Sequence, residues 1–173
     1  METHVSAAPN HQAGRYTPLI TRFICACLGN IGYEIKVSEL TDSELEVLKG
    51  QVSFYKKYRQ DLQFGTLSRL ISPFESNFAA FQIQSTDKKR VFVMYFRVLS
   101  EVNADSQRVK LKYLDKGDNY KVVEHFVPED NNMTMGKAFF TVDNHKNEVF
   151  SADELMHFGL LADRVDSDFN AYM

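Results

Sequence analysis

The chain has 173 residues, a formal net charge of −3 at pH 7 and an apolar fraction of 44%, which suit a globular protein of one domain, or one domain plus part of another. Its lysines and arginines form only short clusters, at 56–59 and 88–90, and this excludes the basic stripe of a nucleic-acid-binding protein. No apolar stretch approaches the ~20 residues of a membrane span, and the polar N-terminus does not resemble a signal peptide. We therefore expect a cytoplasmic protein with no nucleic-acid or membrane partner.

The two cysteines, Cys25 and Cys27, lie two residues apart. On a helix this spacing separates them by ~200° around the axis, so we expect neither a disulfide nor a shared metal ion. Buried free thiols in a reducing compartment are the prediction. The five histidines, at 4, 11, 125, 145 and 157, lack metal-ligand spacing, and we expect no metal site.

Residues 1–65 are predicted to be mainly helical. Thr17 and Pro18 have the pattern of a helix start, a hydroxyl cap followed by proline at the first helical position. Segment 19–28 is apolar on most faces and is followed by Gly29 and Gly32. A helix that is apolar nearly all round needs protein on several sides, so we expect this helix to lack cover in the isolated chain.

A second helix is marked by a capping box at Thr41 and Glu44 and by a stop at Gly65, after Phe64. Apolar residues at steps of three and four predict one face that meets a core. That face comprises Leu45, Leu48, Val52, Tyr55 and Arg59.

From residue 66 onward, short β-rich runs alternate with turns. The runs predicted as strands are 67–71, 78–84, 90–99, 108–114, 120–127, 138–142, 148–150 and 169–172. Residues 87–89 predict a hairpin connection, 115–119 a turn and 153–158 a short helical turn. The run 91–96 is apolar on both faces, as in a central strand. The fold class is therefore α+β by content, mainly an antiparallel β-sandwich after a helical lead.

Candidate catalytic groups are few. Asp153 and Glu154 are adjacent acids, but neighbours in sequence point in different directions, so a solvated or capping role is favoured over acid–base work. Nucleophile-elbow, Walker and dinucleotide motifs are absent from the sequence, and no cofactor is expected. The chain has no tryptophan, which argues against an independent carbohydrate-binding module without eliminating it.

Residues 1–19, which read M-x-x-H-V-S-A-x-P-N-H-Q-x-G-R-x-T-P-L, resemble a motif of the family 36 α-galactosidases. Glu2, Ala8 and Ala13 are small departures from it. The resemblance continues in chain order through 32–34, 51–56, 63–65, 69–74, 94–99 and 153–160. The loop at 122–147 is longer than the family leads us to expect, and the end at 173 is slightly short.

The resemblance implies a parent enzyme with a β-rich N-terminal domain, a catalytic (β/α)₈ barrel and a C-terminal β-sandwich. Residues 1–65 would be a helical remnant of the last unit of the barrel, with its final strand around His4 to Ala8, and residues 66–173 the sandwich. The parent would be a retaining enzyme with an aspartate nucleophile in a W-D-x-x-R-like motif and an aspartate acid–base in an S-D-x-T-D-like motif. Neither motif occurs in this sequence, so no residue here inherits a catalytic role.

For substrate binding, the candidates are His4, Asn10 and His11. They would lie at the rim of the parent's pocket or, as we favour, support the barrel's final loop. Met1 coincides with a methionine inside the family motif, so we expect the chain to begin at an internal codon or an introduced cut.

The predicted function is that of a C-terminal fragment of an α-galactosidase, with a structural role and no activity alone. Its partners would be the missing N-terminal and barrel domains. The intact enzyme, expected to be a homo-oligomer, would act on terminal α-galactosides such as melibiose and raffinose. Two alternatives stay open: an independent carbohydrate- or protein-binding β-sandwich module, and complementation by a separate chain that carries the rest of the barrel.

Overall fold

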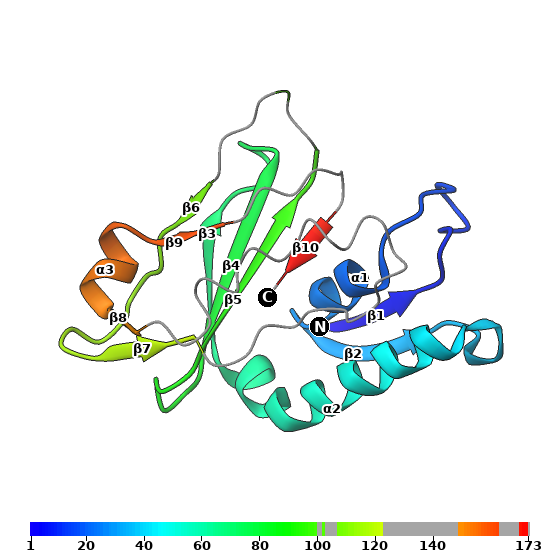
Figure 1. Ribbon diagram of the computed structural model, residues 1–173, viewed down its shortest axis with the longest axis horizontal. Helices are drawn as coiled ribbons and strands as arrows, with labels where there is room; N and C mark the ends of the chain where they lie inside the picture. Colours follow the sequence, from blue (N-terminus) through cyan, green and yellow to red (C-terminus); the bar gives the residue numbers. More distant parts are fainter. Residues whose placement is uncertain (100–101, 103–106, 123–148, 163–169, 173) are drawn as a thin grey trace.

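The computed structural model describes residues 1–99, 102, 107–122, 149–162 and 170–172. A mixed α/β segment over residues 1–65 is followed by antiparallel strands (Figure 1). Within these residues, no helix combines the length and the apolarity that a bilayer span requires.

The first segment contains two parallel strands. β1 (Glu2–Ser6) and β2 (Asn30–Glu34) pair in register, from Glu2 opposite Asn30 to Ser6 opposite Glu34. α1 (Leu19–Ala26) connects them, so the three elements form a βαβ unit, the repeat of a (β/α)₈ barrel. The sequence predicts one strand at 4–8, whereas the structure has two, and the first ends at Ser6. Residues 30–34 were missed because the glycines around them indicated only the end of a helix.

The start of α1 differs from the prediction. Pro18 is the N-cap residue rather than the first helical residue, and no side chain caps the helix, so Thr17 does not have the predicted role. The helix ends at Ala26, two residues before the predicted end.

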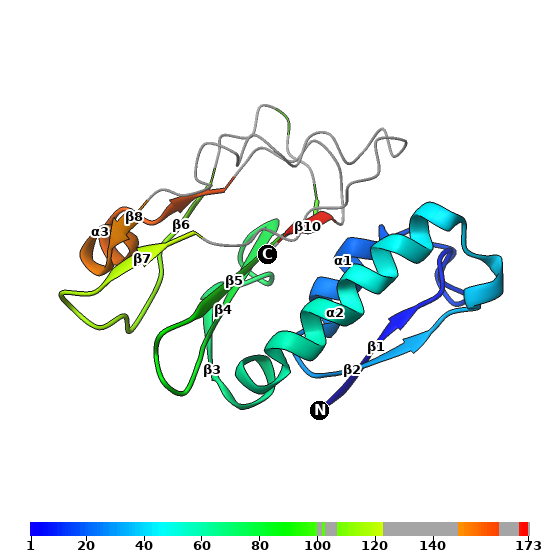
Figure 2. The ribbon, with the colours of Figure 1, turned by 60° about the horizontal axis from the view of Figure 1, so that its bottom comes forward.

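A short 3₁₀ turn, η1 (Val37–Glu39), leads into the long helix α2 (Asp42–Phe64). The predicted capping box is present: Thr41 Oγ1 accepts from the Glu44 N–H, and a Glu44 carboxylate oxygen accepts from the Thr41 N–H at 2.8 Å. Figure 2 shows α2 running alongside α1 and β2.

The predicted buried face of α2 is mostly wrong. Only Tyr55 of that set packs against the core, and Arg59 is exposed. The residues that make the contact lie one position away around the helix: Val47, Gln51, Phe54, Tyr58 and Leu62. α2 carries apolar residues on two neighbouring faces, and periodicity alone could not tell which of them meets this core.

α2 ends at Phe64, as predicted, but Gly65 is needed for space. Its φ of −68° is open to any residue. A Cβ at position 65 would lie 2.3 Å from the Asp61 carbonyl oxygen, 2.6 Å from that of Gln84 and 2.8 Å from Ile83 Cγ2. The glycine thus lets the helix end press directly against the sheet.

A four-stranded antiparallel sheet forms the centre of the molecule, in the order β10-β5-β4-β3. Its strands are β3 (Thr66–Ile71), β4 (Phe78–Gln84), β5 (Val91–Arg97) and β10 (Asn170–Tyr172). β4 has its predicted bounds, and the predicted hairpin joins it to β5 through Lys88, whose φ is +59°. β5 lies between β4 and β10, as expected for a strand that is apolar on both faces.

A second layer covers one face of this sheet. It consists of β6 (Arg108–Val109) paired with β9 (Leu160–Leu161), β7 (Asn119–Lys121) paired with β8 (Val149–Ser151), and α3 (Ala152–His157). The turn at 115–119 and the helical turn at 153–158 are confirmed. Most of the predicted strand 120–127 and all of 138–142 lie outside the described residues, and β8 pairs with β7.

The predicted strand 108–114 is mostly wrong, because regular pairing stops after Val109. Tyr113 has a φ of +59° and is 73% exposed, whereas alternation places it with buried Val109 and Leu111. Leu114 is buried in its place.

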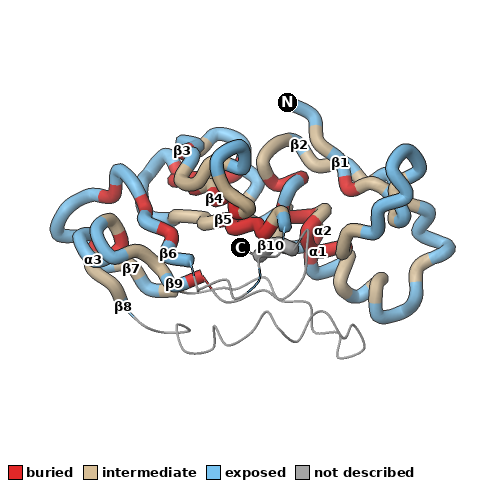
Figure 3. The backbone as a smooth tube through the Cα atoms, turned by 90° about the horizontal axis from the view of Figure 1, so that it is seen from above, coloured by how far each residue is buried: buried red, intermediate tan, exposed pale blue. Residues whose placement is uncertain are grey.

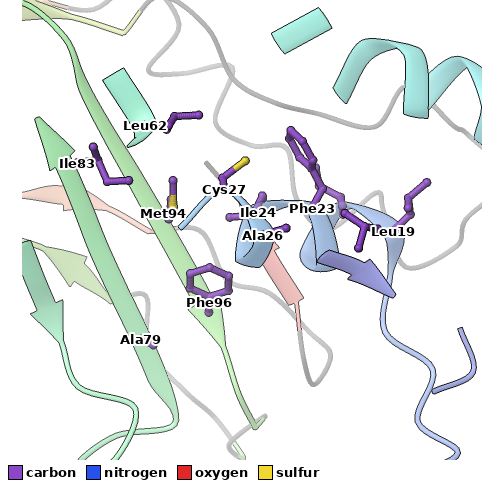
Figure 4. Close-up of a cluster of buried hydrophobic side chains, with 12 residues drawn as sticks. Leu19, Phe23, Ile24, Ala26, Cys27, Leu62, Ala79, Ile83, Met94 and Phe96 are labelled. Atoms are coloured by element: carbon purple, nitrogen blue, oxygen red, sulfur yellow. The ribbon is translucent and has the colours of Figure 1, made fainter. Parts of the chain in front are cut away.

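The central sheet is buried on both faces. Met94 and Phe96 of β5 belong to the cluster that includes α1 and α2, whereas Val93 and Tyr95 pack toward the second layer. Figure 4 shows side chains from α1, α2, β4 and β5 gathered in the first cluster, and Figure 3 shows buried residues continuing from α1 into the sheet. Segments 1–65 and 66–99 therefore share one core.

This shared core corrects the expectation that α1 lacks cover. Phe23 and Ile24 are fully buried, and Ile20 is 4% exposed. The cover comes from β1, α2, the sheet and the backbone of β10, which lies against α1. Full burial of each such side chain stabilises the fold by roughly 1.5–3 kcal/mol. An exposed apolar helix is therefore not a reason to expect a second chain or self-association.

Candidate functional site

The β1–β2 pair has one covered and one open face. Val5 of β1 is fully buried, and Ile31 and Tyr33 of β2 pack against the same helix-side cluster. Thr3 shares the covered side with Val5, and its hydroxyl donates to Ala26 O of α1. Because side chains alternate along a strand, the other residues of the two strands point to the opposite side. These residues, here called the polar face, are Glu2, His4, Ser6, Asn30, Gly32 and Glu34.

Two side chains of the polar face meet. His4 Nε2 lies 3.4 Å from Glu34 Oε2, and the two side chains are 53% and 68% exposed. Both side chains are exposed, so water screens the attraction between them. Glu34 is the last residue of β2, whereas His4 is the middle residue of β1. The contact therefore places one imidazole and one carboxyl group near the carboxyl ends of the two strands, the end at which (β/α)₈ enzymes have their active sites.

The β1–α1 loop, residues 7–18, continues from this end of β1. Asn10 organises it: its side-chain oxygen accepts from the N–H groups of Gln12 and Ala13 at 3.0 and 2.9 Å. Its backbone N–H donates to Arg15 O, and its carbonyl accepts from Gly14 N–H, both at 2.8 Å. Gly14 has a φ of +63°, which favours glycine. These contacts fold the loop into a compact turn.

Arg22, in the first turns of α1, fastens the loop at both ends. Its Nε donates to Thr17 O at 2.9 Å, and its terminal NH1 donates to Ser6 O. The guanidinium is half-buried, and desolvation lowers its pKa, an effect opposed by Tyr16 and Glu44. The two acceptors are the carbonyl of the last residue of β1 and one just before α1.

The three candidate residues from the sequence fall into different places. His4 lies on the polar face against Glu34. Asn10 uses its side-chain oxygen inside the loop, and His11 is exposed on the loop. Arg22 was not among the candidates, because a lone arginine on an apolar helix gives no sign that it reaches back to two carbonyls.

Of the acidic pair in α3, Glu154 has the capping role that the sequence favours, and Asp153 is exposed. Glu154 Oε2 accepts from the backbone N–H and the hydroxyl of Ser151, both at 2.8 Å. These hydrogen bonds hold the pKa of the Glu154 carboxyl below its ordinary value. Among the described residues, no three His, Cys, Asp or Glu side chains are grouped so that they could hold a metal ion.

The cysteines are both free, as predicted, but only Cys27 is buried. Cys25 is exposed, which corrects the expectation for that residue. The two cysteines face in different directions around the helix axis, so Cys27 points into the core and Cys25 points away from it.

Comparison with known proteins identifies the family. Residues 78–173 match the model of the glycosyl hydrolase family 36 C-terminal domain, and residues 1–65 match the model called Melibiase. The chain belongs to glycosyl hydrolase family 36. The resemblance found in the sequence is thereby confirmed, together with the mixed fold of a helical segment followed by antiparallel strands.

Family 36 relatives match over the whole chain. It is 40% identical over 173 residues to the α-galactosidase AgaA of Geobacillus stearothermophilus, of which it covers 21%. It is 34% identical over 173 residues to an α-galactosidase of Lactobacillus acidophilus, again covering 21%. The chain thus spans about a fifth of the length of the curated relatives it matches.

Solved structures of the family agree with the fold. The crystal structure of AgaA superposes with a TM-score of 0.79, covering 97% of this chain and 20% of that one. The galactosidase domain of the α-galactosidase–sucrose kinase AgaSK gives 0.81 at 30% identity, covering 99% of this chain and 21% of that one. A variant of AgaA has been solved in complex with raffinose.

Proposed function

We propose that this chain is the C-terminal part of a family 36 α-galactosidase and hydrolyses α-galactosides only when it is joined to the rest of the enzyme. The observation that carries this proposal is the β1–β2 pair. Within the described residues, the two parallel strands pair only with each other. A barrel strand has a neighbour on each side, so the free edges and the polar face fit a wall of a barrel whose other strands lie elsewhere.

The chemistry of hydrolysis supports the same proposal. A retaining glycosidase uses two carboxyl groups roughly 5 Å apart, one that attacks the anomeric carbon and one that protonates the leaving oxygen. The sequence has no tryptophan and so no W-D-x-x-R-like motif, and the contact on the polar face offers one carboxyl, that of Glu34. In this proposal the remaining four-fifths of the enzyme supply the nucleophile and the acid.

The role of this chain is then to close the barrel and support it. β1 and β2 contribute two strands, while α1 and α2 cover them on the outside. The central sheet packs on these helices through Ile83, Met94 and Phe96. In this proposal it supports the two barrel strands from the outer side of their helices. The polar face turns hydrogen-bonding groups toward the interior.

The test is a fusion in which this chain replaces the matching fifth of AgaA. We expect the fusion to hydrolyse a chromogenic α-galactoside, whereas the isolated chain does not. A fusion that unfolds cooperatively, and is therefore folded, but shows no turnover would refute the proposal. So would turnover by the isolated chain.

Titration calorimetry separates this proposal from an independent carbohydrate-binding module. Raffinose is titrated into the isolated chain at a protein concentration sufficient to detect millimolar affinity. We expect no saturable heat. Saturable binding would favour the module.

A further inference from the structure

The β1–α1 loop is held from two directions. Inside it, Asn10 makes four hydrogen bonds, two through its side-chain oxygen and two through its backbone. At its base, Arg22 joins Ser6 O to Thr17 O. The loop's shape is therefore fixed by its own contacts and by one side chain outside it.

The chemistry of the anchor requires an arginine. A guanidinium is planar and carries several N–H donors in a rigid fork, so it can reach two carbonyl oxygens at once. A lysine at position 22 has a single ammonium group on a flexible stem and would hold one end of the loop at a time. Placing a guanidinium in a half-buried position costs desolvation, which lowers its pKa, and its two bonds offset that cost.

The loop also lies where it can contact a substrate. It begins at the carboxyl end of β1, beside the His4–Glu34 contact. Its exposed side chains include His11, Gln12 and Tyr16, which offer hydrogen-bonding groups and an aromatic ring. Hydroxyl groups and sugar faces are bound by such groups, provided that the backbone holds them in place.

From this arrangement we propose that Arg22 is a positioning residue, which fixes the β1–α1 loop so that its exposed face binds the galactoside in the assembled enzyme. The inference rests on the proposed function. Beyond the proposed function, it assigns Arg22 a role: through its hydrogen bonds to two backbone carbonyls, Arg22 holds the loop in the shape that binds the galactoside.

The first experiment reads loop order in the isolated chain and does not depend on activity. Hydrogen exchange is measured for the amides that donate within the loop, at Asn10, Gln12, Ala13 and Gly14, in the unsubstituted chain and in the Arg22→Met and Arg22→Lys variants. We expect about tenfold faster exchange in R22M and an intermediate rate in R22K, because the loop loses both anchors or one of them. Unchanged exchange at these amides in both variants would overturn the positioning role.

The second experiment measures kinetics in the fusion with AgaA, using raffinose. We expect R22M to raise KM about tenfold with kcat changed less than threefold, and R22K to recover part of the loss. Faster exchange with unchanged KM would overturn the part of the inference that concerns binding.

Gln82→Leu is the matched control, because it weakens the fold on the opposite side of the sheet. It is expected to lower stability while leaving both loop exchange and KM unchanged. If Q82L changes them as much as R22M, loss of stability explains the effect and the inference is wrong. An inactive unsubstituted fusion would count against the proposed function alone, since the exchange data would still report on Arg22.

Discussion

The side chain of Gln82 pairs with the backbone of Lys112 in the way that a neighbouring strand would. Its Nε2 donates to Lys112 O at 2.7 Å, and its Oε1 accepts from Lys112 N–H at 2.9 Å. Gln82 is 1% exposed, on the face of β4 that meets the second layer. The amide therefore holds segment 110–114 against the sheet although that segment forms no ladder beyond Val109.

Replacement of Gln82 tests this link. Gln82→Leu keeps a side chain of similar size but leaves the Lys112 N–H and carbonyl without their hydrogen-bond partner. We expect a loss of about 1–3 kcal/mol in the free energy of unfolding, measured by urea denaturation. The control is Gln60→Leu, at an exposed position of α2, which should change stability little. Equal effects of the two variants would contradict the assigned role of Gln82.

Alanine substitutions at two glycines, one inside α2 and one directly after it, should change stability in opposite directions. Gly65→Ala places a Cβ against two carbonyl oxygens and Ile83, so we expect a loss of about 1–3 kcal/mol from overpacking. Gly50→Ala adds a methyl group where nothing lies within 4 Å, and should stabilise the helix by about 0.5–1 kcal/mol. The two variants are compared by urea denaturation. A neutral G65A would show that the helix end does not press on the sheet.

Thiol reactivity distinguishes the two cysteines. Cys25 is exposed, but packing around its thiol raises its pKa to about 11, and burial raises that of Cys27 further. Because the thiolate is the reactive form, we expect slow labelling of one thiol in the native chain at pH 8, with a rate that rises about tenfold per pH unit. Both thiols should react quickly in denaturant. Fast native labelling of two thiols would show that Cys27 is accessible.

The cap of α3 predicts a pH effect. Hydrogen bonds from Ser151 lower the pKa of Glu154 in the folded chain, so the carboxylate contributes stability that is fully present above its unfolded pKa. That contribution is lost as the pH falls through the lowered folded pKa. Unfolding free energies of the chain and of Glu154→Gln are compared from pH 7 to pH 3. We expect the advantage of the unsubstituted chain to shrink below the ordinary value of 4.5, and a constant difference would contradict the account.

The sequence predicted those elements whose pattern is local. The capping box of α2 and the bounds of β4 were found because cap residues and β-rich runs act within a few positions. The position of β5 inside the sheet followed from its two apolar faces. Family membership came from a long motif in chain order rather than from any one residue.

The errors share a physical cause, which is that contacts distant in sequence decided the outcome. Segment 108–114 alternates like a strand, but the positive φ of Tyr113 breaks the extended conformation. The segment is held to the sheet by the hydrogen bond from the Gln82 side chain to the backbone of Lys112. The face of α2 that is buried depends on where the sheet lies. At the candidate site, the motif offered His4 as a candidate, which stays a prediction, whereas the contacts of Arg22 depend on the carbonyl groups of two other segments.

We propose that this chain supplies two strands of a galactoside-cleaving barrel and needs the remaining strands for turnover. The most direct measurement is the initial rate of α-galactoside hydrolysis at equal molar concentration for three samples: the isolated chain, AgaA without its matching fifth, and the two joined in one polypeptide. The account predicts turnover only in the third sample. Hydrolysis by the first sample, or a folded but silent third sample, would contradict it.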